Sequence, residues 1–371
     1  MSVYNEVFKN KKVLVTGNTG FKGSWLTTWL LQLGADVYGI SNEVPTNPSM
    51  FEVLELQQKI NHSFIDIRDY EKLKNKIVEI EPDFIFHLAA QPIVSISYAD
   101  PVGTISSNVL GTTHVLESIR NLNNKCVAII ITSDKCYENV EQIWGYKETD
   151  QVGGKDVYSG SKGAAEVIFH SYYESFFKDK HPNIRIASAR AGNVIGGGDW
   201  AKDRIVVDCM QSWSKGDKVT IRSPKATRPW QHVLEPLSGY LRLAQYLFEN
   251  FEAGLLNGES FNFGPKPEQN QTVLQLLSDL SKYWDFRFVD EAFEVTDNIP
   301  FHEAGLLKLN CEKAQAYLKW NPNLNYAETI QFVSSWYYGF YKNKAEMYQI
   351  TLNQITEYQF LARERELRWS E

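Results

Sequence analysis

The sequence of 371 residues contains no apolar run of about 20 residues, the length that a membrane-spanning helix requires. Residues 1–12 are polar and lack the apolar centre of a secretion signal. There is no basic excess either, because 38 lysines and arginines stand against 45 aspartates and glutamates, a net charge of −7. That balance argues against a dedicated nucleic-acid binder. We therefore expect a cytoplasmic protein with neither a membrane nor a nucleic-acid partner.

Cysteine is scarce, and internal repeats and low-complexity segments are missing. The four cysteines show no C-x-x-C pair, which favours neither a metal site nor a disulfide framework and fits a reducing compartment. Hydrophobic residues make up 43% of the chain and charged residues 22%, ordinary values for a globular protein. The length accommodates two modest domains. We expect a globular protein without a bound metal.

What is present in the first half is a regular alternation of short apolar runs with helical patterns. This alternation is typical of βαβ units on a parallel sheet. Strands are predicted at Lys12–Thr16, Asp36–Ile40, Ser63–Ile67, Phe84–Leu88, Val127–Thr132 and Ile184–Ala189. Helices are predicted before Gly34 and over Tyr70–Glu81, the second stopped by Pro82. The predicted fold class is α/β, a Rossmann-type doubly wound parallel sheet.

Beyond Gly192 the alternation breaks at glycine- and proline-rich stretches, as in loops around a ligand. A helix at Val233–Asn250 and a strand at Glu259–Phe263 are predicted to return to the sheet. Further helices are predicted at Gln271–Tyr283, Asn310–Leu318 and from Glu328 to about Arg368. We expect a Rossmann domain of residues 1–191 with 233–262, a smaller mixed substrate-binding lobe of residues 192–232 and 263–340, and a helical tail of residues 341–371.

Three glycines spaced G-x-x-G-x-x-G, Gly17 to Gly23, connect the first predicted strand to the first helix. Such glycines let the backbone approach a pyrophosphate, which rests on the amides of the helix N-terminus. Ser41 ends the second strand, Glu43 follows, and no arginine is near, a pattern that favours NAD over NADP. Asp66 and Ile67 follow the third strand and are candidates for contact with the adenine.

Tyr158 and Lys162 are spaced i, i+4, which places them about 5.4 Å apart along one face of a helix. A nearby ammonium lowers the pKa of a tyrosine, so that its phenolate can accept a hydroxyl proton. Ser133 directly follows the strand at Val127–Thr132, at the carboxyl edge where such sheets bind ligands. Together the three residues predict hydride transfer to or from a carbinol carbon.

These features resemble the extended short-chain dehydrogenase/reductases that act on nucleotide sugars. The matching segments are Thr16–Gly23, Asp66–Asp69, His87–Gln91, Asn108–Thr112 and Tyr158–Lys162. The resemblance implies NAD as cofactor, contacted by Gly17, Thr19, Gly20, Phe21, Lys22, Gly23, Ser41, Asp66, Ile67, Leu88, Ala89, Ala90, Asn108, Tyr158 and Lys162. It also implies a homodimer or a dimer of dimers, joined through helices near residues 108–120 and 158–177.

A narrower resemblance rests on Ser133-Asp134-Lys135. Sugar 4,6-dehydratases carry Thr-Asp-Glu at this place, and CDP-glucose 4,6-dehydratases carry Ser-Asp-Lys. Further matching segments, Lys22–Trp25, Arg190–Trp200 and Arg228–Pro236, extend the resemblance to about residue 245. The implied substrate is a nucleotide sugar, with CDP-glucose favoured, in deoxysugar biosynthesis such as that of lipopolysaccharide O-antigen.

The resembled reaction assigns roles to these residues. Tyr158 would take the proton of the C4 hydroxyl while hydride leaves C4, with Ser133 bonded to the same oxygen and Lys162 holding the ribose. Asp134 would protonate the departing C6 hydroxyl, which requires a carboxyl pKa raised by burial. Lys135 would be either the base for the C5 proton or a charged stabiliser of the enolate. Hydride would then return to C6.

Substrate contacts are expected from Asn193, Arg204, Arg228 and Asn262, since a diphosphate needs cationic and amide donors. His87 is expected to be a strand-end histidine with its hydrogen bonds satisfied. Val157 and Gly160 depart from the proline and asparagine that usually flank the tyrosine in these enzymes. The alternatives are a 4-epimerase, which needs neither a C6 acid nor a C5 base, a dehydratase for another nucleotide, and a catalytically silent NAD-binding regulator.

Overall fold

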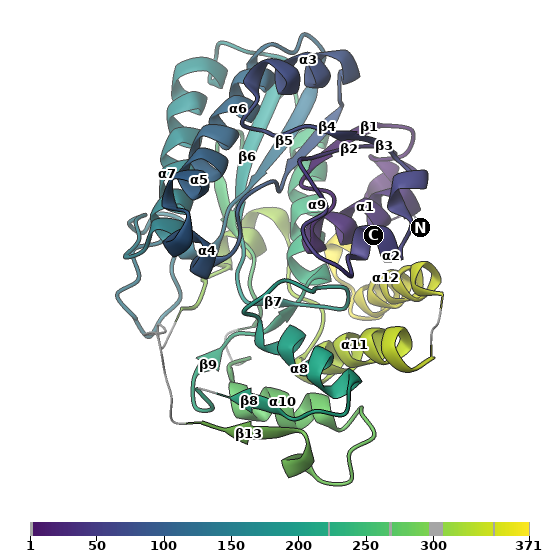
Figure 1. The fold of residues 1–371 in the computed structure, drawn as a ribbon. Helices are drawn as coiled ribbons and strands as arrows, with labels where there is room; N and C mark the ends of the chain where they lie inside the picture. Colours follow the sequence, from purple (N-terminus) through teal and green to yellow (C-terminus); the bar gives the residue numbers. More distant parts are fainter. Residues whose placement is uncertain (1–2, 222, 267–268, 297–306, 344–345, 371) are drawn as a thin grey trace.

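The computed structural model describes residues 3–221, 223–266, 269–296, 307–343 and 346–370. A seven-stranded parallel sheet forms its centre, in the order β11-β6-β5-β4-β1-β2-β3 (Figure 1). Strand order reverses between β1 and β4, and the crevice outside the carboxyl ends of such neighbours is where these sheets bind ligands. The strands are β1 (Lys12–Thr16), β2 (Asp36–Ser41), β3 (Asn61–Phe64), β4 (Phe84–His87), β5 (Cys126–Ile131), β6 (Ile184–Arg190) and β11 (Ser260–Asn262).

Alternate residues of each central strand enter cores on opposite faces of the sheet, because side chains along a strand alternate in direction. In β1, Val13 and Val15 belong to the core beneath α1 (Phe21–Gln32) and α9 (Leu234–Glu249). Leu14 belongs to the second core, beneath α3 (Tyr70–Ile80), α6 (Gly111–Arg120) and α7 (Val157–Tyr172). The sheet is therefore covered by helices on both faces (Figure 1), and the doubly wound α/β prediction is confirmed.

The third strand lies earlier in the chain than the predicted Ser63–Ile67. Its ladder with β2 pairs Tyr38 with Asn61 and ends where Ser41 meets Phe64. Directly afterwards the backbone N–H of Arg68 donates to Asp66 Oδ1, so the chain turns instead of extending the strand. The apolar residues Ile65 and Ile67 suggested a strand, but the pairing with β2 decides where the strand stops.

The chain beyond β6 forms the smaller mixed lobe below the sheet in Figure 1, with β11 and α9 returning to the sheet. Three two-stranded sheets pair β7 (Val194–Ile195) with β10 (Gln231–His232), β8 (Val219–Ile221) with β13 (Phe293–Val295), and β9 (Thr227–Arg228) with β12 (Gln271–Thr272). The helices are α8 (Ile205–Ser214), α10 (Val273–Ser281), α11 (Tyr326–Tyr338) and α12 (Met347–Glu364). None of the helices in the described segments is long and apolar enough to cross a bilayer.

Shorter elements complete the chain. The helix predicted at Asn310–Leu318 contains a π-helical turn, η7 (Ala314–Leu318). The long helical stretch predicted from Glu328 is divided into α11, η8 (Gly339–Asn343), α12 and η9 (Arg368–Ser370). The remaining short elements are η1 (Val3–Glu6), α2 (Met50–Val53), η2 (Leu56–Gln58), α4 (Val94–Ala99), α5 (Pro101–Ile105), η3 (Ser106–Leu110), η4 (Asp134–Cys136), η5 (Tyr173–Phe177) and η6 (Val289–Glu291).

Candidate active site

The glycine loop between β1 and α1 leaves no room for side chains at two of its glycines. Gly17 has a φ of +74°, and a Cβ there would lie 2.7 Å from the backbone nitrogen of Ala89. A Cβ on Gly23 would lie 2.1 Å from the carbonyl oxygen of Gly17. Gly20 is the N-cap of α1 and makes no side-chain cap bond, so the first backbone N–H groups of α1 are left for an anion.

Asn18, which the motif analysis did not single out, fixes the loop against the end of β2. The Ser41 hydroxyl donates to Asn18 Oδ1 at 2.9 Å and accepts from the Thr19 backbone N–H at 3.3 Å. The Thr19 hydroxyl donates to the carbonyl of Glu43 at 2.7 Å. Thr19 and Ser41 are thus brought together at the predicted cofactor edge, where their polar groups hold the loop.

Asp66 and Ile67 lie after β3, next to each other but with different surroundings. The Asp66 carboxylate forms an ion pair with Arg68 at 2.6 Å, and hydrogen bonding to that guanidinium lowers the pKa of Asp66. The Ile67 side chain packs over Gly111, where a Cβ would lie 2.4 Å from Ile67 Cδ1. The Ile67 carbonyl lies 2.9 Å from His114 Nδ1.

His87, at the end of β4, is buried between two threonine hydroxyls. Its Nδ1 lies 2.7 Å from Thr16 Oγ1, and its Nε2 lies 3.1 Å from Thr112 Oγ1. Burial lowers the pKa of His87 to about 3, so the ring is neutral. The expectation of a satisfied strand-end histidine is confirmed. The predicted cofactor residues Leu88, Ala89 and Ala90 follow it directly, and the Ala89 N–H donates to Thr16 Oγ1 at 3.3 Å.

Asn108 joins the segment after β4 to α7. Its amide donates to the Ser161 hydroxyl at 2.9 Å and to the Gln91 carbonyl at 3.1 Å. Its Oδ1 accepts from the Gln91 backbone N–H at 2.8 Å. The side chain is buried, and its polar groups are satisfied within the protein. The structure therefore shows Asn108 bracing the helix that carries Tyr158 and Lys162.

Tyr158, Lys162 and Ser133 meet at the carboxyl end of β5. Asp156 caps α7 by accepting the Ser159 N–H at 2.9 Å, which starts the helix one residue before Tyr158. Ser133 Oγ donates to Asp134 Oδ1 at 2.9 Å, and the Ser133 hydroxyl acts to lower the pKa of the Tyr158 phenol. The side chains of Tyr158, Lys162, Ser133 and Asp134 are all buried. The fold thus brings together the residues that sequence spacing alone had grouped.

Burial shifts the pKa values of the tyrosine and the lysine of this cluster in opposite directions. Burial is the main cause that raises the pKa of Tyr158 to about 12, and the Ser133 hydroxyl and the charge of Arg204 act against that rise. Burial lowers the pKa of Lys162 to about 8, while the charge of Glu166 opposes the decrease. The phenolate form of Tyr158 therefore depends on positive charge nearby, and Lys162 is poised between its two protonation states near neutral pH.

Further cations face the same cluster. Burial, together with the charges of Arg204 and Lys162, lowers the pKa of Lys22 to about 8, and Asp134 acts in the opposite direction. Arg204 forms an ion pair with Asp199. Among the described residues, none forms a hydrogen bond or an ion pair with the Lys22 ammonium. The excess of positive charge around Asp134 fits an anionic ligand.

Asn193 contacts Asp134 through space, and Lys135 follows it in the chain. Asn193 has a φ of +54°, and its Nδ2 is 3.5 Å from Asp134 Oδ2. Lys135 is half-buried on the short turn η4, which Ser133 caps by accepting the Lys135 N–H at 3.3 Å. The position of Lys135 beside the acid is compatible with both roles that the sequence left open.

The two remaining predicted substrate residues lie elsewhere. Arg228 is on β9 in the smaller lobe and donates to the Thr227 carbonyl at 2.8 Å. Asn262 is fully buried; its amide donates to the carbonyls of Tyr146 and Asn310, and its Oδ1 accepts from the Tyr137 hydroxyl at 2.8 Å. Because these bonds occupy its polar groups, Asn262 is not presented to a phosphate as the sequence analysis expected.

A buried ion pair behind the cluster escaped the sequence analysis. Arg190 Nη2 and Glu166 Oε2 are 2.8 Å apart, with both side chains 1% exposed. Thr132, just before Ser133, donates to Glu166, and Arg190 donates to the Tyr137 hydroxyl at 2.7 Å. The pair therefore ties α7 to both ends of the turn that carries Ser133 and Asp134.

Neither metal nor disulfide chemistry has a visible basis in the described parts of the chain. No group of three or more histidine, cysteine or acidic side chains there could hold a metal ion. The four cysteines are buried and free.

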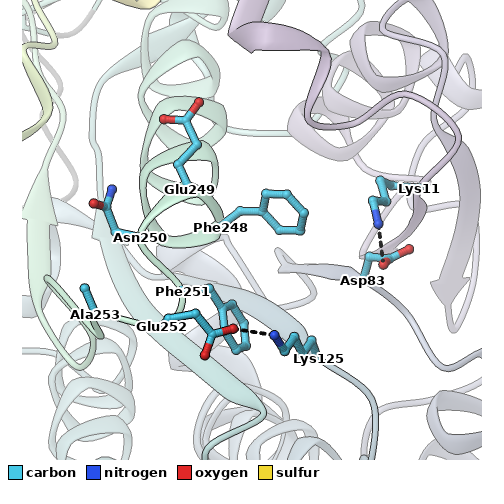
Figure 2. A pocket seen from close by; sticks show the side chains of 9 residues that line it. All are labelled: Lys11, Asp83, Lys125, Phe248, Glu249, Asn250, Phe251, Glu252 and Ala253. Carbon is cyan, nitrogen blue, oxygen red and sulfur yellow. Dashed lines mark hydrogen bonds and ion pairs between the residues drawn. The ribbon is translucent and has the colours of Figure 1, made fainter.

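A cavity of about 450 Å³ lies at the opposite, amino end of the strands (Figure 2). Lys11 and Asp83, which precede β1 and β4, form an ion pair at 3.1 Å across its wall. Lys125, which precedes β5, pairs with Glu252 beside the ring of Phe251. With its cations paired and β5 separating it from Ser133, this cavity plays no part in the site.

Comparison with known proteins decides the family. Residues 14–333 match the sequence model of the GDP-mannose 4,6-dehydratase family. The chain belongs to this family. It is 44% identical to the CDP-glucose 4,6-dehydratase of Salmonella typhimurium, over 95% of this chain and 97% of that protein. It is 25% identical to the CDP-paratose 2-epimerase of Salmonella typhi, over 88% and 98%.

The solved structures agree with this family in fold. The dTDP-glucose 4,6-dehydratase DesIV of Streptomyces venezuelae, solved with NAD and TYD bound, has a TM-score of 0.73 at 18% identity and covers 91% of this chain and 99% of its own. The resemblance drawn from the motifs is therefore confirmed, and so is the Rossmann-type fold.

Proposed function

We propose that this member of the GDP-mannose 4,6-dehydratase family converts CDP-D-glucose to CDP-4-dehydro-6-deoxy-D-glucose. The observation that carries the proposal is the Ser133-Asp134-Lys135 turn set against Tyr158 and Lys162 at the carboxyl end of β5. The 44% identity to a CDP-glucose 4,6-dehydratase over nearly the full chain supports both the reaction and the nucleotide. The product class, a 4-keto-6-deoxy sugar, belongs to deoxysugar biosynthesis.

NAD is the cofactor of this proposal, and the loop residues fit it. A side chain at Gly17 or Gly23 would fill the place where the backbone must approach a pyrophosphate, and the amides that start α1 face that place. Lys162 would hold the ribose. When bound, NAD would supply the acceptor for the C4 hydride and the donor of the hydride at C6. Ser41, rather than an arginine, at the end of β2 supports NAD over NADP.

The chain's own residues supply the proton chemistry. Tyr158, as phenolate, takes the proton of the C4 hydroxyl, and Ser133 holds that oxygen. Because the pKa of Tyr158 is raised to about 12, chiefly by burial, even with Arg204 acting against the rise, we assign Lys162 the further positive charge that the phenolate needs. Asp134 gives a proton to the departing C6 hydroxyl. Lys135 lies one residue from this acid and serves the C5 carbon, as base or as enolate stabiliser.

The substrate's diphosphate is assigned to the smaller lobe. Asn193 lies beside Asp134, the charge of Arg204 acts on Tyr158, and we keep Arg228 as a diphosphate ligand on β9. We assign residues 1–191 with 233–262 to the NAD domain, 192–232 and 263–340 to the nucleotide-sugar lobe, and 341–371 to a helical tail. These ranges include the residues outside the described segments.

A homodimer, alone or as half of a dimer of dimers, completes the proposal. Apolar side chains are exposed on α5, η3 and α7, among them Val102 (75%) and Leu110 (50%). These three elements lie side by side on one face (Figure 1). Val102→Glu and Leu110→Glu would convert the dimer to monomer in light scattering, and an unchanged mass would refute this interface. Free buried cysteines fit the reducing cytoplasm as its location.

The deciding experiment offers purified protein with NAD four substrates separately: CDP-glucose, TDP-glucose, UDP-glucose and GDP-mannose. Loss of one water from CDP-glucose, detected by mass, supports both the reaction and the nucleotide. Epimerised product without water loss would contradict the roles of Asp134 and Lys135. No change in any sugar despite NAD binding would point to the silent regulator.

Tyr158→Phe tests the base. Turnover should fall about 10²–10⁴-fold with NAD affinity retained, since only the phenolic oxygen is removed. Tyr172→Phe makes the same change at the far end of the same helix and should leave the rate unaltered. Equal rates for the two variants would remove Tyr158 from the mechanism.

A further inference from the structure

The two carboxylate oxygens of Asp134 have different neighbours. Oδ1 accepts from the Ser133 hydroxyl at 2.9 Å, whereas Oδ2 lies beside Gly192 and 3.5 Å from the amide nitrogen of Asn193. The backbone N–H of Asp134 also donates to the Ala191 carbonyl at 3.4 Å. The position of Oδ2 therefore depends on residues 191–193, which we call the post-β6 segment because they directly follow that strand.

Gly192 leaves the space that this carboxylate occupies. A Cβ on Gly192 would lie 1.9 Å from Asp134 Oδ2 and 2.0 Å from Asp134 Cγ. The φ of Gly192 is not positive, so the backbone conformation itself does not require glycine. Since ordinary contacts of a Cβ begin at 3.4 Å, a side chain here would displace the carboxylate by more than an ångström. The contact with Asp134 is thus what excludes a side chain.

Gln231, at the start of β10 in the smaller lobe, holds the post-β6 segment in place. Its side chain is buried, with the residue 1% exposed. The side-chain amide donates to the Gly192 carbonyl at 2.8 Å and to the Phe263 carbonyl at 3.2 Å. The backbone N–H of Gln231 donates to the Asn193 carbonyl at 3.2 Å. One residue therefore fixes two consecutive carbonyls of the segment and ties them to the end of β11.

The same part of the smaller lobe carries the diphosphate ligand of the proposed function. Arg228 on β9 precedes Gln231 by three residues, and the Trp230 N–H donates to the Arg228 carbonyl at 3.0 Å. This bond keeps the connection between β9 and β10 short. A substrate held by Arg228 is therefore held by the same short stretch of chain that fixes the surroundings of Asp134.

We propose that Gln231 and Gly192 position the carboxylate of Asp134 for proton delivery to the C6 oxygen. The proposal rests on the proposed function, in which Asp134 is the acid, and both are positioning residues because they act through it. In the step concerned, the C5–H electron pair forms the C5–C6 double bond, the C6–O bond breaks, and its oxygen leaves as water with the proton from Asp134. A misplacement of about 1 Å can cost about 10²-fold in rate.

A substrate that eliminates without a proton tests the position of the acid. In CDP-6-deoxy-6-fluoroglucose, fluoride leaves C6 with little help from an acid, whereas the hydroxyl of CDP-glucose needs one, and both give the same 4-keto-6-deoxy product. Gln231→Met and Gly192→Ala should lower kcat for CDP-glucose about 10²-fold. With the fluoro compound, kcat should fall no more than about tenfold. Asp134→Asn shows the selectivity that loss of the acid itself produces, and the two variants should share it.

Gln354→Met is the matched control. Gln354 is also a buried glutamine, on α12, and its amide donates to the Phe332 carbonyl at 2.8 Å. This variant should leave both rates as in wild type. If Gln231→Met slows the two substrates equally, Gln231 only maintains the structure and the proposal is wrong; this comparison also decides if Gly192→Ala does not fold. Failure of the wild type to dehydrate CDP-glucose would be a different result, refuting the proposed function itself.

Discussion

Replacing Glu166 by glutamine removes the negative charge from the ion pair behind the catalytic turn while keeping the size of the side chain. Its carboxylate meets Arg190 at 2.8 Å and also accepts from Ser188 at 2.9 Å and Ser260 at 3.2 Å. In Glu166→Gln the guanidinium stays in a place that water does not reach, without its counter-charge. An uncompensated buried charge is one of the few single changes with a large cost.

The expected loss is about 3–5 kcal/mol of unfolding free energy. Arg190→Met, which keeps the long apolar stem, should cost a similar amount by stranding the carboxylate. The double variant leaves neither charge behind. Its cost should therefore lie well below the sum of the single losses, giving a coupling energy on the order of 1–3 kcal/mol.

Urea unfolding followed by the fluorescence of the ten tryptophans measures all three variants against wild type. Glu117→Gln is the matched control, since it makes the same change in a surface pair with Arg120 on α6. The control should cost no more than about 0.5 kcal/mol. A Glu166→Gln cost no larger than the control's, or a double variant that equals the sum of the singles, would refute this reasoning.

Three further predictions concern single residues near the site. Gly160→Ala should raise the unfolding free energy by about 0.4–1 kcal/mol, since a Cβ there meets nothing within 4 Å; Gly163→Ala should lower it, because its Cβ would lie 3.0 Å from Gly153 N. His87 has a folded-state pKa of about 3 and an unfolded pKa of about 6.5, so the stability it contributes is present above pH 6.5 and is lost as the pH falls towards 3. Between these two pH values, urea titrations should show that wild type loses about 1.4 kcal/mol of unfolding free energy per pH unit relative to His87→Asn. Asp156→Ala should cost about 1 kcal/mol through the lost cap of α7 and shift the activity profile to lower pH, because the Asp156 charge raises the pKa of Tyr158; an unshifted profile would contradict that coupling.

Nothing in the structure explains why Val157 stands where related enzymes usually carry proline. Gly160 differs, since the open space around it shows that glycine is not required there. The departure at Gly160 therefore bears on helix propensity.

Local patterns were sufficient to predict much of the fold and part of the site. β1, α1, α3 and β4 were predicted to within a few residues, because buried strands and capped helices carry periodic apolar residues and their own stop signals. The glycine spacing and the Tyr158–Lys162 spacing are also local, since one loop and one helical turn contain them. Their chemistry could therefore be read before any tertiary contact was known.

Tertiary structure decided what depends on partners distant in the chain. The end of β3 is set by pairing with β2, and no local pattern encodes that ladder. Asn262 resembled a phosphate ligand, yet its hydrogen bonds to Tyr137, Tyr146 and Asn310 commit it to the interior. Tyr158 on α7 meets Ser133 and Asp134 at the end of β5 only in the folded chain. The sequence by itself determined which groups can carry the chemistry. Only the tertiary structure determined which of those groups lie within hydrogen-bond distance of one another, because contacts between distant segments exist only after the sheet has formed.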